Sequence, residues 1–144
     1  MFRILLVEDD ESQRTMMTAA LRADGYDVFG AESAENALEI LDGVKVDMAI
    51  CDVMMPGMDG FELTRELRAA YRDLPIMIVT AKSEIADKEV GFRAGTDDYM
   101  VKPLDLSEFR LRVRALFRRA KIQTEKQVAV GGVIANAQDH TVRY

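Results

Sequence analysis

The chain alternates short runs of apolar residues with longer amphipathic segments. The apolar runs are short and mostly continuous, at residues 4–7, 28–31, 48–51, 76–79 and 99–101. Runs of this length and continuity are typical of parallel β-strands that are covered on both faces. The pattern therefore predicts five buried strands.

The segments between the runs carry apolar residues at helical spacing. Helices are expected at residues 12–23, from the N-cap Ser33 to Gly43, from Asp59 to the exit loop at 73–75, at about 84–93, and at 106–120. Five strands that alternate with five helices imply right-handed crossovers and a doubly wound parallel sheet, an α/β fold of the (βα)5 flavodoxin-like type. Ligands of such sheets bind outside the carboxyl ends of the strands.

Charged and hydroxyl side chains gather at these strand ends. Glu8 and Asp9 follow the first run, Asp52 the third, Thr80 the fourth and Lys102 the fifth. Three carboxylates close together are not all ionised unless a positive charge lies between them, and Mg²⁺ (or Mn²⁺) prefers such oxygen ligands. A lysine and a hydroxyl beside them would suit a phosphoryl group, so the pattern indicates phosphoryl transfer to Asp52 as nucleophile.

Composition narrows the class of protein. The 144 residues suit one domain with a short extension, and no stretch is apolar for long enough to cross a membrane. The chain shows no signal peptide, so we expect a soluble, cytoplasmic protein without a membrane partner. One cysteine and one histidine exclude an internal disulfide and a Cys/His zinc site within this sequence.

The net charge of −6 is unevenly distributed. Residues 1–108 hold 11 Lys/Arg against 23 Asp/Glu, and residues 109–144 hold 8 against 2, so the two parts carry −12 and +6. The basic end is compatible with a nucleic-acid patch or with a solvated helix face. The aromatic residues among its arginines, Phe109 and Phe117, are expected to face the core, which leaves none for base stacking and favours the solvated face.

Five ordered motifs give the chain a family resemblance over about residues 2–120. They are residues 4–11 (ILLVEDDE), 52–60 (DVMMPGMDG), 79–81 (VTA), 95–99 (GTDDY) and 101–104 (VKPL). In these motifs the chain resembles the receiver domain of bacterial two-component response regulators. The resemblance implies a regulatory domain and not an enzyme, which accepts a phosphoryl group from a sensor histidine kinase and catalyses only its own phosphorylation and dephosphorylation.

The resemblance also implies a role for each matching residue. Asp52 would be the phosphoacceptor, Asp9 a direct ligand of Mg²⁺, Glu8 its water-mediated ligand, and the Met54 carbonyl a further ligand. The phosphoryl-binding and switch residues would be Thr80, Ala81, Tyr99, Lys102 and Pro103. A cis Lys102–Pro103 peptide bond is expected, and Tyr99 would turn inward when Thr80 moves toward a phosphoryl group.

The segment 88–119 resembles the face formed by the fourth helix, fifth strand and fifth helix in DNA-binding regulators with winged-helix effectors. Such receivers form homodimers through this face. The candidate cross-subunit pairs are Lys88 with Glu108, Asp98 with Arg112, and Asp97 with Arg118 or Arg119. The alternative is a set of exposed charges that each contribute little.

The remainder of the chain reads differently. We expect a receiver domain at 1–121, and at 122–144 a linker with the first strands, at 127–136 and 141–144, of a truncated winged-helix effector. No recognition helix follows, so DNA would be bound only through an effector domain absent from this sequence.

Three rival functions remain open. An aspartyl-phosphate type phosphohydrolase also uses an Asp at a strand end with Mg²⁺, although its nucleophile normally follows the first strand. A flavin-binding module of the same fold is disfavoured by the acidic pocket. A degenerate, constitutively dimeric receiver is the third. The main expectation is a phosphorylation-dependent regulator of transcription.

Overall fold

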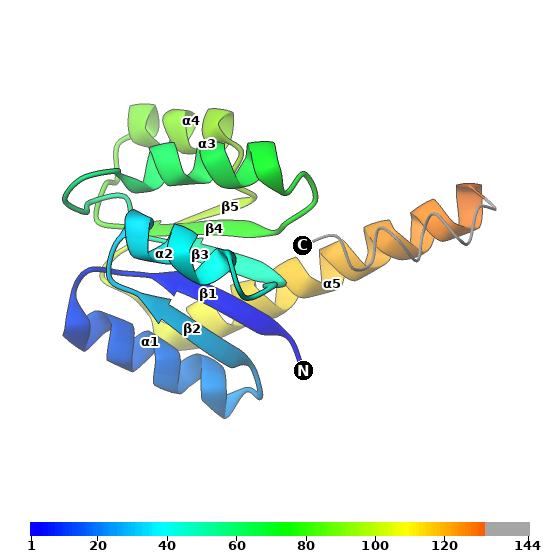
Figure 1. Ribbon diagram of the computed structural model, residues 1–144, viewed down its shortest axis with the longest axis horizontal. Coiled ribbons are helices and arrows are strands. Elements are labelled where there is room, and N and C mark those ends of the chain that lie inside the picture. Colours follow the sequence, from blue (N-terminus) through cyan, green and yellow to red (C-terminus); the bar gives the residue numbers. More distant parts are fainter. Residues whose placement is uncertain (132–144) are drawn as a thin grey trace.

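A computed structural model describes the backbone of residues 1–131 and the side chains of residues 1–121 (Figure 1). Its elements in chain order are β1 (Arg3–Val7), α1 (Glu11–Ala23), β2 (Asp27–Ala31), α2 (Ala34–Leu41), β3 (Met48–Cys51), α3 (Gly60–Ala70), β4 (Ile76–Thr80), α4 (Ile85–Ala94), β5 (Asp98–Val101) and α5 (Leu106–Gly131). The predicted alternation of five strands with five helices is confirmed. No helix within the described range is long and apolar enough to span a membrane.

The strands form one parallel sheet in the order β2-β1-β3-β4-β5. Helices α1 and α5 cover one face, and α2, α3 and α4 lie on the other (Figure 1). The strand order reverses direction between β1 and β3, so the chain leaves these neighbouring strands toward opposite sides of the sheet. This is the point at which doubly wound sheets bind ligands.

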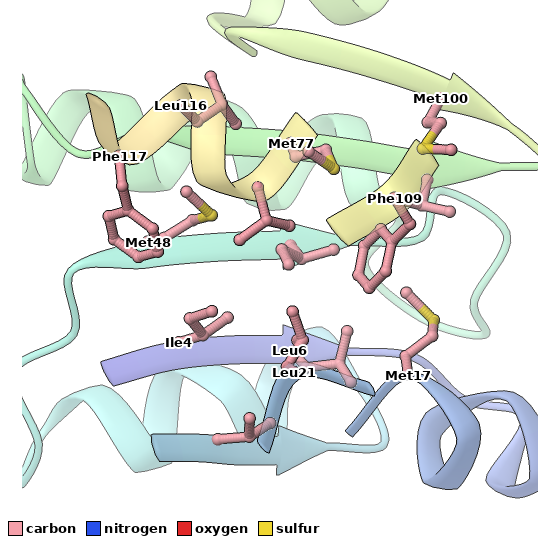
Figure 2. Packing of buried hydrophobic residues seen from close by; sticks show 14 residues of the cluster. Ile4, Leu6, Met17, Leu21, Met48, Met77, Met100, Phe109, Leu116 and Phe117 are labelled. Carbon is pink, nitrogen blue, oxygen red and sulfur yellow. The ribbon is translucent and has the colours of Figure 1, made fainter. Parts of the chain in front are cut away.

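Successive residues of the central strands supply both layers of the core. In β1, Ile4 and Leu6 pack with Met17, Leu21 and Phe109 of the α1–α5 layer, where side chains from both helices meet over the sheet (Figure 2). Their neighbours Leu5 and Val7 pack under α2 and α3. Because both faces are covered, the strands read as continuous apolar runs.

Side-chain caps begin the helices that lead away from the predicted site. The Asp10 carboxylate accepts the Gln13 N–H at the start of α1, and Ser33 Oγ accepts the Asn36 N–H at the start of α2, as predicted. Asp59 and Glu62 form a reciprocal capping box at the start of α3. These caps set where each loop ends and each helix begins.

Helix α4 leaves its larger apolar side chains exposed. Its buried residues are Gly91 and Ala94, whereas Ile85, Val90 and Phe92 are exposed, and no side chain caps its N-terminus. Its C-terminal end is marked by Gly95 with φ of 114°. The attachment of α4 to the body is therefore concentrated in its C-terminal half.

Helix α5 continues further than the sequence analysis expected. The prediction that it ends at residue 120 and that a strand starts at 127 is wrong for residues 121–131, which continue the helix. Residues 121–130 contain neither proline nor glycine and are rich in Lys, Gln, Glu and Ala, which favour a helix, and two glycines follow at 131 and 132. The expected strand residues 132–136 and 141–144 lie outside the described residues.

Candidate functional site

Asp52 follows β3 directly and is only 7% exposed. Its N–H donates to the Val7 carbonyl of β1, which continues the strand pairing by one residue. Its Oδ1 accepts the Met54 N–H at 3.1 Å. The carboxylate is thus held at the switch point of the sheet by the strand before it and the loop after it.

Two further carboxylates lie beside Asp52. One oxygen each of Glu8, Asp9 and Asp52 can be chosen so that all lie within 4.8 Å of one another. Glu8 is buried and Asp9 is exposed, so the cluster reaches from the core to the surface. Three convergent carboxylate oxygens fit a hard divalent cation of the Mg²⁺ type and do not suit soft metals.

Lys102 joins the two buried carboxylates. Its Nζ donates to Glu8 Oε1 at 2.7 Å and to Asp52 Oδ2 at 2.8 Å. Its backbone N–H donates to the Thr80 carbonyl, and the Lys102–Pro103 peptide bond is cis, as predicted. The ammonium therefore bridges the two buried carboxylates of the acidic cluster.

Burial and hydrogen bonding oppose each other in this cluster. Burial raises the pKa of Glu8, against the lowering effect of its hydrogen bond from Lys102. Burial also disfavours the charged form of Lys102, but the hydrogen bonds to Asp52 and Glu8 outweigh it, and the pKa of Lys102 is raised. The structure thus keeps a positive charge where it neutralises two buried acids.

The predicted switch pair lies next to this site. Thr80 is fully buried, and its Oγ1 accepts the Lys82 N–H at 3.4 Å, while the adjacent Ala81 is exposed. The Tyr99 hydroxyl donates to the Lys82 carbonyl at 2.8 Å, and burial raises the pKa of Tyr99 to about 12. Tyr99 is therefore already turned inward and fastened to the loop before α4.

Sequence reasoning missed what makes room for this tyrosine. A Cβ at Gly91 would meet Tyr99 ring carbons at 3.0 Å and Ile78 Cδ1 at 3.3 Å. The available signal was a glycine inside a helix, which costs stability unless close packing requires it.

Several charges of the predicted dimer face pair within the chain. Arg112 donates to Asp98 Oδ1 at 2.9 Å and to Glu108 Oε2 at 2.7 Å. Asp97 pairs with Arg68 of α3, a residue that the sequence analysis did not single out. Lys88 is half-buried, and Arg118 and Arg119 are exposed. Contacts between subunits remain a prediction.

Known proteins resemble this chain in sequence. The family model for the response regulator receiver domain matches residues 4–114. The heme response regulator HssR of Staphylococcus aureus (strain MRSA252) is 38% identical over 136 residues, which are 94% of this chain and 60% of HssR. The chain thus spans about three fifths of the length of the curated relatives it matches.

Solved structures agree with the sequence match. A putative response regulator from Chloroflexus aurantiacus J-10-fl is 38% identical with a TM-score of 0.76, over 80% of this chain and 96% of that one. The non-phosphorylated HemR receiver domain of Leptospira biflexa is 30% identical with a TM-score of 0.76, over 81% and 94%. A CheY-like receiver protein from Methanospirillum hungatei JF-1, 23% identical with a TM-score of 0.82 over 85% and 98%, shares the fold. The chain belongs to the response regulator receiver domain family.

Proposed function

We propose that this receiver accepts a phosphoryl group on Asp52 from a sensor histidine kinase. The observation that carries the proposal is the position of the Lys102 ammonium, within hydrogen-bonding distance of both Glu8 and Asp52, the two buried carboxylates of the acidic cluster. An acyl phosphate carries about two negative charges where the carboxylate carried one, so positive charge beside Asp52 would stabilise the phosphorylated form. Lys102 supplies that charge from the protein itself.

Glu8, Asp9 and Asp52 would hold Mg²⁺ or Mn²⁺, with the Met54 carbonyl as a further ligand. A bound ion would neutralise charge on the transferring phosphoryl group. An Asp52 carboxylate oxygen attacks phosphorus in line as the P–N bond to the kinase histidine breaks, which forms an acyl phosphate. The bonding pair of the P–N bond stays on the histidine nitrogen.

The neighbouring residues would then respond to the new charge. Lys102 turns its hydrogen bonds toward the phosphoryl oxygens, and the Thr80 hydroxyl, which now accepts from Lys82, donates its own proton to one of them. Tyr99 donates a hydrogen bond to the Lys82 carbonyl and so contacts the same loop residue as Thr80. Phosphorylation would favour this inward arrangement by a shift of population.

The consequence that we propose is homodimerisation through the α4-β5-α5 face. Lys88, Asp97, Asp98, Glu108, Arg112 and Arg119 would contribute to that face. DNA binding and control of transcription would follow through an effector domain outside this sequence. Support comes from the charges gathered on these elements and from the match to HssR, a longer response regulator.

Intact-mass spectrometry after incubation with acetyl phosphate and Mg²⁺ tests the phosphorylation. The wild type should gain the mass of one phosphoryl group, Asp52→Ala should gain none, and Asp42→Ala, which removes an exposed acid at the C-terminal end of α2, should behave as wild type. Uptake by Asp52→Ala at the wild-type rate would exclude Asp52 as the acceptor. Steady turnover of phosphate monoesters would point to the phosphohydrolase alternative.

A further inference from the structure

Arg68, in the last turn of α3, joins this helix to two other segments through its guanidinium group. Nη1 donates to the carbonyls of Arg72 at 2.8 Å and Leu74 at 2.7 Å, which lie between α3 and β4. Nε and Nη2 donate to the Gly95 carbonyl after α4, at 3.0 and 2.7 Å. Nη2 also pairs with Asp97 Oδ2 at 2.8 Å. All three nitrogens are used, and only a planar guanidinium can satisfy acceptors on this many sides.

The turn from α4 into β5 is fixed by these contacts. Asp97 Oδ2 also accepts the Ile76 N–H of β4 at 2.8 Å, so one carboxylate oxygen is held by two donors. The Thr96 hydroxyl contacts the carbonyls of Ile76 and Asp98 at 3.0 and 2.9 Å. A Cβ on Gly95 would lie 2.8 Å from Arg68 Cγ, so the arginine stem packs directly on the turn.

Asp97 is held in place without being buried. Its side chain is 43% exposed, and its Oδ1 makes no hydrogen bond among the residues whose side chains the structure describes. Asp97 and Arg119 also line one small cavity of about 80 Å³ with Leu116. An acid and a base thus lie at the same end of the predicted dimer face, where a twofold axis can bring each against its counterpart in a second copy.

We propose that Arg68 is a positioning residue for dimerisation, which fixes the Asp97 carboxylate so that its second oxygen receives Arg118 or Arg119 of a second copy of the chain. The inference rests on the proposed homodimer. A carboxylate that is already immobilised loses little conformational freedom on pairing, which favours association. Arg68 offsets part of the charge on Asp97, but an exposed ion pair depends more on geometry than on net charge.

Dimerisation of the full chain in Mg²⁺ and beryllofluoride, a phosphoryl mimic, tests the proposal by sedimentation. Arg68→Lys keeps a positive charge but cannot hold Gly95, Leu74 and Asp97 together. We expect it to weaken the dimer by about tenfold, because the twofold axis repeats the loss. Arg65→Lys is the matched control, since Arg65 is exposed one turn earlier on α3, and should leave the affinity unchanged.

A double-mutant cycle separates positioning from a general loss of stability. Arg68→Lys is combined with Arg118→Ala and, separately, with Arg119→Ala. If Arg68 acts through Asp97, its effect on the dimer constant should shrink sharply when the paired arginine is already missing. Full additivity with both arginines would overturn the inference, and so would wild-type dimerisation of Arg68→Lys.

Two further measurements keep the outcome interpretable. Asp97→Asn retains an oxygen for the Ile76 N–H and should weaken the dimer as Arg68→Lys does; wild-type affinity in this variant would contradict the role given to Asp97. Phosphoryl uptake should be normal in both variants, since neither residue contacts Asp52. If the wild type takes up the phosphoryl group normally but stays monomeric, the proposed homodimer and this inference are both wrong and the proposed phosphorylation is not affected. If the wild type takes up no phosphoryl group, the proposed phosphorylation itself is wrong.

Discussion

Replacing Gly60 with alanine should displace the proposed phosphorylation site without changing a charged residue. Gly60 is the buried first residue of α3. A Cβ there would lie 2.2 Å from the Asp52 carbonyl oxygen, 2.7 Å from Val53 Cα and 2.8 Å from the Asp52 carbonyl carbon. All three atoms are backbone, so no side-chain rotation relieves the contact.

The size of the displacement follows from these distances. Ordinary contact begins at 3.4 Å, and 3.4 less 2.2 leaves a shortfall of about 1.2 Å. The Asp52 backbone and α3 must move apart by about this much, and the part of the movement that Asp52 takes shifts its carboxylate against Lys102 and Met54. A misplacement of roughly 1 Å lowers reaction rates by ~10²-fold, and overpacking of this kind costs about 1–3 kcal/mol of stability.

The assay is the initial rate of phosphoryl uptake from acetyl phosphate with Mg²⁺, together with urea unfolding. Gly43→Ala is the matched control, because a Cβ at Gly43 meets nothing within 4 Å. Gly60→Ala should be slow and less stable, and Gly43→Ala close to wild type in both measurements. Wild-type rate and stability in Gly60→Ala would refute the reasoning.

Three other changes test separate features. Lys102→Met leaves two buried carboxylates without their cation and should lower the free energy of unfolding by about 2 kcal/mol. This is less than the ~3–5 kcal/mol for breaking a fully buried ion pair, because one carboxylate can take up a proton. Millimolar Mg²⁺ should restore part of the lost stability, and an unchanged urea midpoint would contradict the prediction. The hydrogen bond from Arg110 lowers the pKa of Asp24, so this ion pair stabilises the fold above the usual pKa of an aspartate, and the stabilisation is lost as the pH falls through the lowered pKa. Asp24→Asn should therefore have a lower Tm than wild type at pH 7, and the difference in Tm should disappear on acidification. A difference that does not change with pH would contradict this prediction. Burial raises the pKa of Cys51 to about 12, so a thiol reagent should label it only in denaturant, and rapid labelling of the native protein would show that the thiol is accessible.

The fold and the acidic site could be predicted because each depends on a short-range pattern. Continuous apolar runs specify strands that are covered on both faces. Parallel strands bring Glu8, Asp52 and Lys102 to one edge of the sheet, independently of the conformation of the loops. Their proximity in the structure follows from the topology. The end of α5 was predicted wrongly because residues 121–130 favour a helix locally, whereas the strand assignment after 127 was taken from a resemblance.

The ion pairs could not be predicted in the same way. The sequence analysis assigned Arg112, Asp98 and Asp97 to one face. A long side chain can form an ion pair with any oppositely charged group within its reach, and in the described residues these partners lie within the same chain. Arg68 gave no signal because most of its acceptors are backbone carbonyls. Which carbonyls converge on one guanidinium depends on how loops distant in the chain meet, and no local pattern encodes that.

The sparse packing of α4 has a thermodynamic consequence. None of residues 85–90 is buried, so releasing the first half of this helix from the body exposes very little apolar surface. Local opening there should require only a small part of the free energy of global unfolding, and amide hydrogens in this half should exchange well before those of the central strands. A signal of modest free energy, such as a few new hydrogen bonds at the strand ends, is then large enough to redistribute the conformations of α4 while the sheet stays intact.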